Sequence, residues 1–185
     1  MRSRGLCLAV SHLRGFARNA EGVAGLEFAM IVPFMLALYL GSIEVGNAMA
    51  VQFKIALATR AVADLASQYT SINNSTMSGI LAAASTVVAP YSASGMVVTI
   101  TEITTNSAGQ GTITWSDSLN GTAHSVGQSV TLPTALQIAS TSMIWSEVTY
   151  PYKPTFGYVL TSTINISQSG YFYPRLSSSV TRVNS

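Results

Sequence analysis

The chain has few charged residues: Asp, Glu, Lys and Arg make up 9% of its 185 residues, against about 25% in an average soluble domain. It has one cysteine, Cys7, and two histidines, His12 and His124. A single cysteine excludes an intrachain disulfide, and so few thiols and imidazoles leave little for a metal site. Low charge combined with 48% hydrophobic residues favours a membrane-attached or secreted protein.

Catalytic motifs are also lacking. The sequence contains no P-loop, no strand-linked GxGxxG, no HExxH and no GxSxG. The acids after Phe28 occur singly, and His124 lies in a glycine-rich stretch where we expect an exposed loop residue. We therefore predict no enzymatic activity, no cofactor and no metal. From Val23 onward the chain has five basic and six acidic residues, so it is nearly neutral and has no basic patch for nucleic acid.

Positive charge is concentrated at the N-terminus, where Arg2, Arg4, Arg14 and Arg18 precede an apolar segment. Residues 1–21 lack the apolar run of about 7–15 residues that a secretory signal peptide carries. An uncleaved or differently processed membrane segment is therefore expected. The positive flank predicts that the N-terminus is cytoplasmic and that the C-terminal domain lies across the membrane.

The apolar segment has the length of a membrane span. Residues 28–43 are uncharged, and Glu27 and Glu44 flank them, about 26 Å apart on a helix and so close to the roughly 30 Å of a hydrocarbon core. We predict a span over about residues 26–46, with a kink or local melting at Pro33, which lacks an amide. The residues assigned to this span are Met30, Pro33, Phe34, Leu36, Leu38 and Leu40, with Glu44 at the far interface.

The helical pattern continues beyond this span. Apolar residues recur at spacings of three and four, which predicts one helix from about Gly25 to Gln68. Its stripe could pack against the chain's own domain, which we favour, or against neighbouring helices in an assembly. The stripe comprises Ala48, Val51, Ile55, Ala58, Val62, Leu65, Tyr69 and Ile72. The expected division is a leader (1–22), a long helix (23–70) and an extracytoplasmic domain (71–185).

The last part of the chain alternates between polar and apolar residues and contains many turn formers. The pattern predicts a short helix over residues 77–89, capped by Asn74, Ser75 or Thr76, followed by an antiparallel sheet. The fold class is therefore α+β: a long helix with a small antiparallel-sheet domain and one short extra helix. The expected strands are 96–101, 112–116, 143–150 and 161–167 (continuing toward 173), with an edge segment at 180–183, a hairpin turn at 106–111, a loop at 118–129 and a helical turn at 133–139.

Aromatic residues are frequent in this part of the chain. They could form a carbohydrate platform, but small sheets use such residues as core, and we favour core. They are Trp115, Trp145, Tyr150, Tyr152, Phe156, Tyr158, Tyr171, Phe172 and Tyr173.

A resemblance rests mainly on the first third of the chain. The basic leader is followed by Gly22-Val23-Ala24-Gly25-Leu26-Glu27-Phe28-Ala29, then by Leu40-Gly41-Ser42-Ile43-Glu44-Val45-Gly46, and then by Arg60-Ala61-Val62-Ala63-Asp64-Leu65-Ala66. Weaker similarity comes from Val148 to Pro154 and from Tyr173-Pro174-Arg175. Together these residues resemble the TadE-like family of minor pilins or pseudopilins of the bacterial tight-adherence (Flp-type) pilus.

The resemblance implies cleavage by an aspartyl prepilin peptidase after Gly22, which would make Val23 the mature N-terminus. Phe28 stands where a major Flp pilin usually has tyrosine, and the chain is much longer than a major pilin, so an accessory or tip subunit is expected. The implied partners are the prepilin peptidase, other pilins or pseudopilins, the pilus assembly platform and membrane lipid. The implied location is the bacterial inner membrane, with possible incorporation into an extracellular pilus.

Elementary electrostatics gives Glu27 a role in assembly, together with its neighbour Phe28. Cleavage would create an ammonium group on Val23, four residues from Glu27 and so on the same helix face. A carboxylate that enters a low-dielectric helix bundle needs such a cation. Alternatively, Glu27 is an interfacial carboxylate that the helix dipole favours. The alternative function for the chain is an uncleaved, signal-anchored extracytoplasmic binding module.

Overall fold

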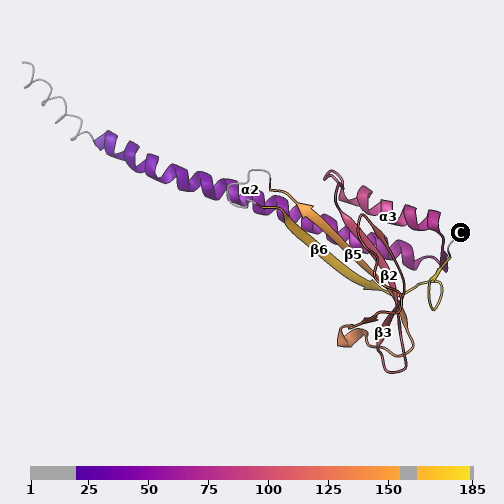
Figure 1. Cartoon of the computed structure of the whole chain (residues 1–185). Helices are drawn as coiled ribbons and strands as arrows, with labels where there is room; N and C mark the ends of the chain where they lie inside the picture. Colours follow the sequence, from indigo (N-terminus) through magenta and orange to yellow (C-terminus); the bar gives the residue numbers. More distant parts are fainter. Residues whose placement is uncertain (1–19, 155–161, 184–185) are drawn as a thin grey trace, which may run out of the picture. The chain divides into compact units, whose positions relative to one another are not determined.

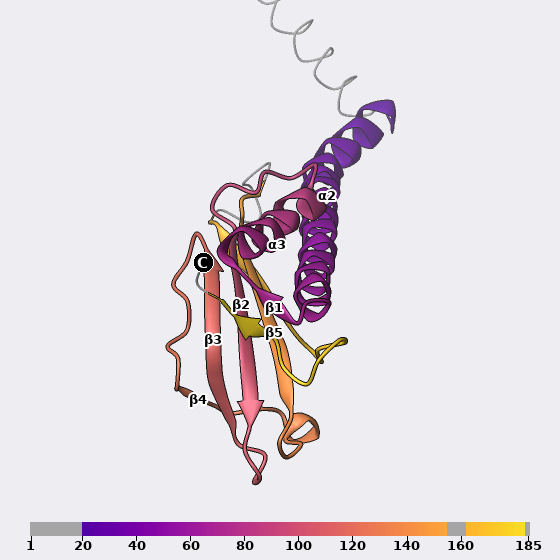
Figure 2. The ribbon, with the colours of Figure 1, turned by 90° about the vertical axis from the view of Figure 1, so that its right-hand side faces the viewer.

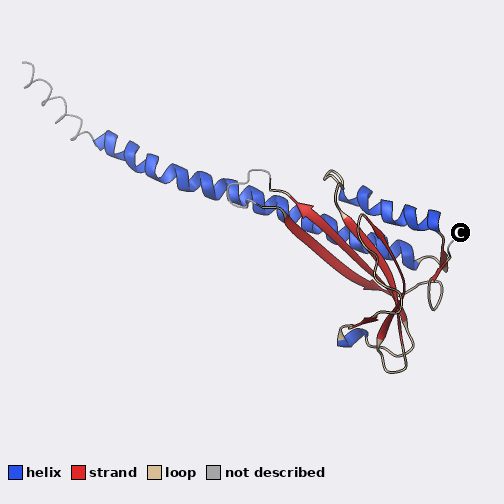
Figure 3. Cartoon of the chain, viewed as in Figure 1, coloured by secondary structure: helices blue, strands red, loops and turns tan. Residues whose placement is uncertain are grey.

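The computed structural model describes residues 20–154 and 162–183. The long helix α2 (Ala20–Ser67) precedes a shorter helix, α3 (Asn74–Val88), and an antiparallel sheet. Figure 1 follows these elements along the chain, and Figure 3 separates helix from strand. The chain divides into two compact units, Met1–Val45 and Gly46–Ser185, with α2 continuous across the division. The predicted α+β class is confirmed.

The main sheet has five strands in the order β4-β3-β2-β5-β6, and every neighbouring pair is antiparallel. Three of the predicted strands, β2, β3 and β5, extend beyond the predicted ends, because pairing with neighbours continues past the alternating core residues. The fourth, predicted from residue 161, begins at Ile164 and continues to Phe172, while residue 161 lies outside the described residues. A bulge between Glu102 and Ile103 lets β2 continue past the predicted end, and β5 runs through Pro151. The strands are β2 (Val97–Thr105), β3 (Gly111–Leu119), β4 (Ser129–Val130), β5 (Ser142–Tyr152) and β6 (Ile164–Phe172).

A second sheet joins two distant segments. β1 (Ser71–Ile72) pairs in parallel with β7 (Thr181–Arg182). The expectation that residues 180–183 add an edge strand to the main sheet is therefore wrong. Arg182 fixes the segment in place, because its Nε donates to Asp117 Oδ2 of β3 at 2.7 Å and its Nη2 donates to Asn74 Oδ1 at 2.7 Å.

Helix α3 begins three residues earlier than predicted. Its N-cap is Asn73, whose side-chain oxygen accepts a 2.8 Å hydrogen bond from the Thr76 backbone amide. This bond satisfies one of the amides that a first helical turn leaves unpaired. The predicted caps Asn74, Ser75 and Thr76 already lie inside the helix.

The predicted hairpin turn at 106–111 and the predicted helical turn at 133–139 are both present. The β2–β3 hairpin turns at Asn106 and Gly109, where the Gly109 amide donates to the Asn106 carbonyl at 3.0 Å. Gly109 has a φ of +77°, and a Cβ there would lie 2.6 Å from the Gln137 carbonyl oxygen, so glycine is required. A single 3₁₀ turn, η1 (Thr134–Leu136), occupies the predicted helical turn.

The main core lies between the sheet and a helix layer formed by α3 and the second half of α2 (Figure 2). The stripe residues Val51, Ile55, Ala58 and Val62 are fully buried. Of the two interpretations of the stripe, packing within the chain's own domain is the one observed for these residues. Tyr69 is 41% exposed, because α2 ends at Ser67 before the stripe reaches it.

A smaller core cluster lies on the opposite face of the sheet. Ile103, Leu132 and Met143 form it, and Trp145 and Tyr171 pack against it half-buried. The core interpretation is confirmed for Trp115, Tyr150 and Tyr152, all of which are buried in the main core. Phe172 is half-buried beside that core, Tyr173 is exposed, and Phe156 and Tyr158 lie outside the described residues.

Candidate functional site

The predicted processing stretch lies near the N-terminal end of the described part of α2. Gly22 and Gly25 have open space around them, and no described atom lies within 4 Å of a Cβ built on either. Val23, Glu27 and Phe28 are all exposed. The stretch is therefore accessible in the described part of the chain. Its two glycines weaken the helix locally, by about 1 kcal/mol each relative to alanine.

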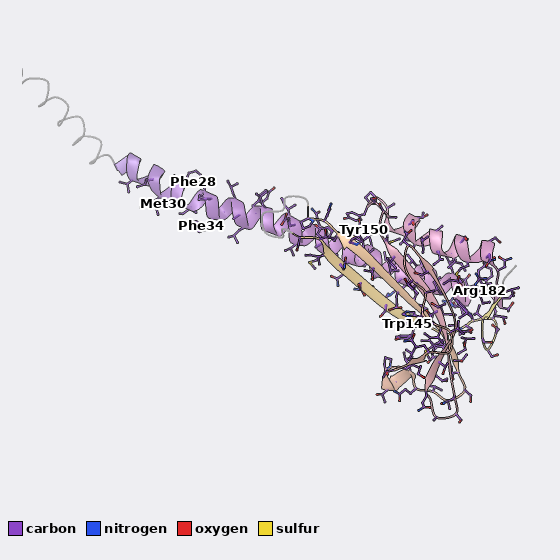
Figure 4. The ribbon with its side chains drawn as sticks, viewed as in Figure 1. Phe28, Met30, Phe34, Trp145, Tyr150 and Arg182 are labelled. Carbon is purple, nitrogen blue, oxygen red and sulfur yellow. The ribbon has the colours of Figure 1, made fainter. Side chains whose placement is uncertain are left out.

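The following turns of α2 expose large apolar side chains. Phe34 is 73% exposed and Leu38 is 76% exposed. Figure 4 shows Phe28, Met30 and Phe34 standing out from the ribbon. Such a contiguous apolar surface marks contact with a membrane or with other proteins. The other large apolar residues exposed here are Ile31, Met35, Leu36 and Tyr39.

By length and composition, the helix from Gly22 to Ser67 can cross a membrane. Its most apolar window has a mean hydropathy of 2.0, and none of that window is buried. The described part of the chain contains one such helix. Helical structure continues through Pro33 without interruption, so the local melting predicted there is not observed. Leu40, which also belongs to the predicted span, is half-buried.

The two acids that flank the apolar residues differ in exposure. Glu27 is exposed, whereas Glu44 is only 1% exposed. Glu27 lies four residues after Val23, so the two share one helix face. A carboxylate on this exposed, apolar surface is accessible to a cation from the chain itself or from a neighbour. The position of Glu44 at a membrane interface stays a prediction.

The acids of the second unit have structural partners. Glu102 is buried, and its Oε1 accepts from Ser142 Oγ at 2.6 Å and from the Val180 amide at 2.7 Å. The indole of Trp115 donates to the Val180 carbonyl at 2.7 Å. Both polar groups of the Val180 backbone are thus held by side chains from the sheet. Two further acids form ion pairs, Asp117 with Arg182 and Asp64 with Arg175.

His124 lies in the predicted loop but is half-buried rather than exposed. Its Nε2 lies 2.6 Å from Glu147 Oε2, and its ring stacks on Trp145 with centroids 4.8 Å apart. Trp145 stacks in turn on Tyr171 at 5.9 Å. Burial, with a smaller contribution from Glu147, raises the pKa of Tyr171 above its ordinary value. The local composition of the loop gave no signal of these partners, which lie on β5 and β6.

The described residues contain no group of three or more His, Cys, Asp and Glu side chains placed to hold a metal ion. The Glu102 carboxylate accepts hydrogen bonds from Ser142 and Val180, and the Glu147 carboxylate is hydrogen-bonded to His124. The arrangement in the second unit therefore stabilises the fold. Within the described residues, the large apolar side chains of the first unit are exposed, and such a surface favours contact with a membrane or with other proteins.

Residues 22–64 match the model of a family described as TadE-like protein. No curated protein and no solved structure matches the chain. The match begins at Gly22 and includes Leu40 to Gly46 and Arg60 to Asp64, which confirms the predicted resemblance for these residues. The family is a pilus component and not a known family of enzymes.

Proposed function

We propose that this chain, whose residues 22–64 form a TadE-like region, is a minor pilin or pseudopilin of a tight-adherence (Flp-type) pilus system. The TadE-like region indicates a protein associated with that pilus. The observation that carries the finer proposal is where the region begins. It starts at Gly22, the residue after which the sequence predicts cleavage, and it continues into the exposed apolar half of α2.

The first step is hydrolysis of the Gly22–Val23 peptide bond by a prepilin peptidase. Water supplies one oxygen of the new Gly22 carboxylate, and both of its protons end on the Val23 nitrogen, which is therefore an ammonium group at neutral pH. The leader leaves with its four arginines. Gly22 supports this role because it has open surroundings and low helix propensity, so the chain can open locally for a peptidase.

The second step is assembly through the first half of α2. Before assembly, membrane lipid covers Phe28, Met30, Phe34 and their neighbours. In an assembly, helices of other subunits replace that lipid. Glu27 then enters a low-dielectric bundle, and the Val23 ammonium, in the same chain or a neighbour, neutralises it. The C-terminal domain remains on the extracytoplasmic side of the inner membrane.

The intact mass of the protein purified from membranes of its native host tests processing. Loss of residues 1–22 is the expected result. A full-length mass, or cleavage after the apolar segment, would contradict the proposal. A full-length protein with a stably folded domain would instead support the alternative function, an uncleaved, signal-anchored binding module.

Substitution of Glu27 tests assembly. We expect Glu27→Ala to insert into the membrane normally but to enter pili about tenfold less efficiently or worse, because the Val23 ammonium loses its partner. The measurement is the ratio of this subunit in sheared pili to that in membranes. Glu21→Ala is the matched control, since that acid lies in the leader. Normal incorporation of Glu27→Ala would overturn the role given to the carboxylate.

A further inference from the structure

The two edges of the five-stranded sheet are protected differently. At one edge, β4 pairs with Gly111 and Thr112 of β3. The chain after β3 then returns along the same edge, where the Ile113 amide donates to the Gln128 carbonyl at 3.0 Å and the Gly127 amide donates to the Ile113 carbonyl at 2.8 Å. This edge is therefore covered by the chain itself over β4 and around Ile113.

The other edge is β6 (Ile164–Phe172). It pairs with β5 along its whole length without a register shift, and no described strand pairs with its other side. An edge strand offers alternate amide and carbonyl groups to a further strand. Proteins usually block such edges with charged residues, proline or bulges. Residues 164–172 contain none of these, so none of these three devices interrupts roughly 30 Å of regular strand edge, and no other described strand pairs with it.

The second half of α2 runs beside this edge (Figure 1). A groove of about 200 Å³ lies between Ala56, Thr59 and Arg60 of the helix and residues 168–172 of β6. Gly170 brings the two elements close, since a Cβ there would lie 3.7 Å from Thr59 Cγ2. The groove is therefore bounded by a helix flank on one side and by the open strand on the other.

That helix flank combines apolar residues with a cation. Phe53 and Met49 precede Ala56 by three and seven residues, so they share its side of the helix. Each is 65% exposed although both belong to the second, folded unit. Arg60 is exposed in the same groove, and no ion pair is recorded for it in the described part of the chain. A segment that complements this surface would therefore supply the backbone of a strand, apolar side chains and a carboxylate.

We propose that β6 and this flank of α2 receive an extended segment of a different protein as an additional strand of the sheet. The segment has apolar residues at alternate positions, which pack on Phe53 and Met49, and an acidic residue that pairs with Arg60. Backbone hydrogen bonds to β6 supply affinity, and the two kinds of side chain supply specificity. That the partner is a neighbouring pilus subunit rests on the proposed function, whereas the docking edge does not.

A second copy of this chain does not fit the edge. Its β3 edge is partly covered by its own β4 and returning loop. Antiparallel pairing of β6 with a second β6 would reverse the direction of residues 46–67 of α2, which run alongside β6. Under the proposed function two copies are anchored in one membrane and share one direction, so the exclusion of a second copy also rests on that function. The partner is therefore a strand that belongs to another protein.

Site-specific photo-crosslinking of the full chain in its native host tests the proposal. A photoreactive amino acid replaces Ser169, which is exposed on β6, and in a control replaces Thr114, which is exposed on β3. We expect Ser169 alone to crosslink to a different protein, at an extended segment that contains an acidic residue. No yield above the Thr114 control, a crosslink to a second copy, or a crosslink to a helix would overturn the proposal.

Charge reversal sharpens the test. Arg60→Glu should lower the crosslink yield about tenfold, and conversion of the mapped acid of the partner to lysine should restore it. Lys54→Glu, on the other side of the same helix, is the matched control and should leave the yield unchanged. An Arg60→Glu variant with normal yield, or one that the partner's lysine does not rescue, would contradict the pairing. The intact mass of the same sample reports cleavage after Gly22, so failure of the edge and failure of the proposed function are separately visible.

Discussion

The two halves of α2 are both rich in apolar residues but have opposite surroundings. In the first half Phe34 and Leu38 are exposed, whereas in the second half Val51 and Ile55 are fully buried. The difference lies in the arrangement of the polar residues. The second half carries the exposed Arg60 and other polar residues away from the buried stripe, which confines most buried apolar contacts to one side of the helix.

The first half has no such polar side between Glu27 and Glu44. A helix that is apolar all round must be covered all round, by lipid or by other helices. Apolar content therefore shows that a helix will be covered, while the periodicity of its polar residues shows what covers it.

Ile55→Ala should lower the free energy of unfolding by about 2–5 kcal/mol, because it leaves a cavity in the core between α2 and the sheet. Phe53→Ala, two residues earlier on the exposed flank, should change it by less than about 0.5 kcal/mol. Denaturant unfolding of the full chain in detergent, followed by tryptophan fluorescence, measures both. Equal destabilisation by the two variants would break the distinction between the stripe and the flank.

The two halves of the molecule also use carboxylates differently, and Glu102→Ala tests this. It leaves the Ser142 hydroxyl and the Val180 amide without their acceptor, so we expect a loss of about 1–3 kcal/mol in the free energy of unfolding. Glu102→Gln keeps an acceptor oxygen and should lose less. Glu27→Ala should leave unfolding of the domain unchanged, and a matching loss there would mean that Glu27 is a structural acid like Glu102.

The smallest effect concerns pH. Burial is the main cause that raises the pKa of Tyr150 and Tyr171 above 10, with smaller contributions from Tyr91 and Glu147 respectively. Above pH 10 the unfolded chain loses these protons first, so it binds fewer protons than the folded chain, and stability falls as pH rises. The contribution is fully present below pH 10. A Tyr150→Phe, Tyr171→Phe double variant should show a shallower fall, and an unchanged slope would contradict the assignment.

The sequence predicts α2 well because its signals are local. The recurrence of Val51, Ile55, Ala58 and Val62 at spacings of three and four identifies both the helix and its buried side. The N-cap of α3 was missed because Asn73 is followed by three residues of similar capping ability, and only the backbone geometry selects among them. Boundaries between similar residues are a weak point of any local pattern.

Non-local partners were out of reach for a different reason. Nothing near His124 in the chain indicates Glu147 or Trp145, since the contact depends on how the loop returns across β5. The two residues of β1 likewise carry no signal for β7. The processing stretch stays a prediction from its residue pattern, and the part from Gly22 onward is the region that the TadE-like model matches.

The pairing of β1 with β7 has a consequence for the order of events during synthesis. Arg182 contacts Ile72 across a sequence separation of 110 residues. The hydrogen bonds of Trp115 and Glu102 to the Val180 backbone likewise cannot form until Val180 has been synthesised. Helix α2 is made early, but β1, the segment directly after it, pairs with residues that are made more than a hundred positions later. Contacts this distant form late and slowly, so the domain stays incomplete, and its sheet accessible to quality control, until the chain is nearly finished.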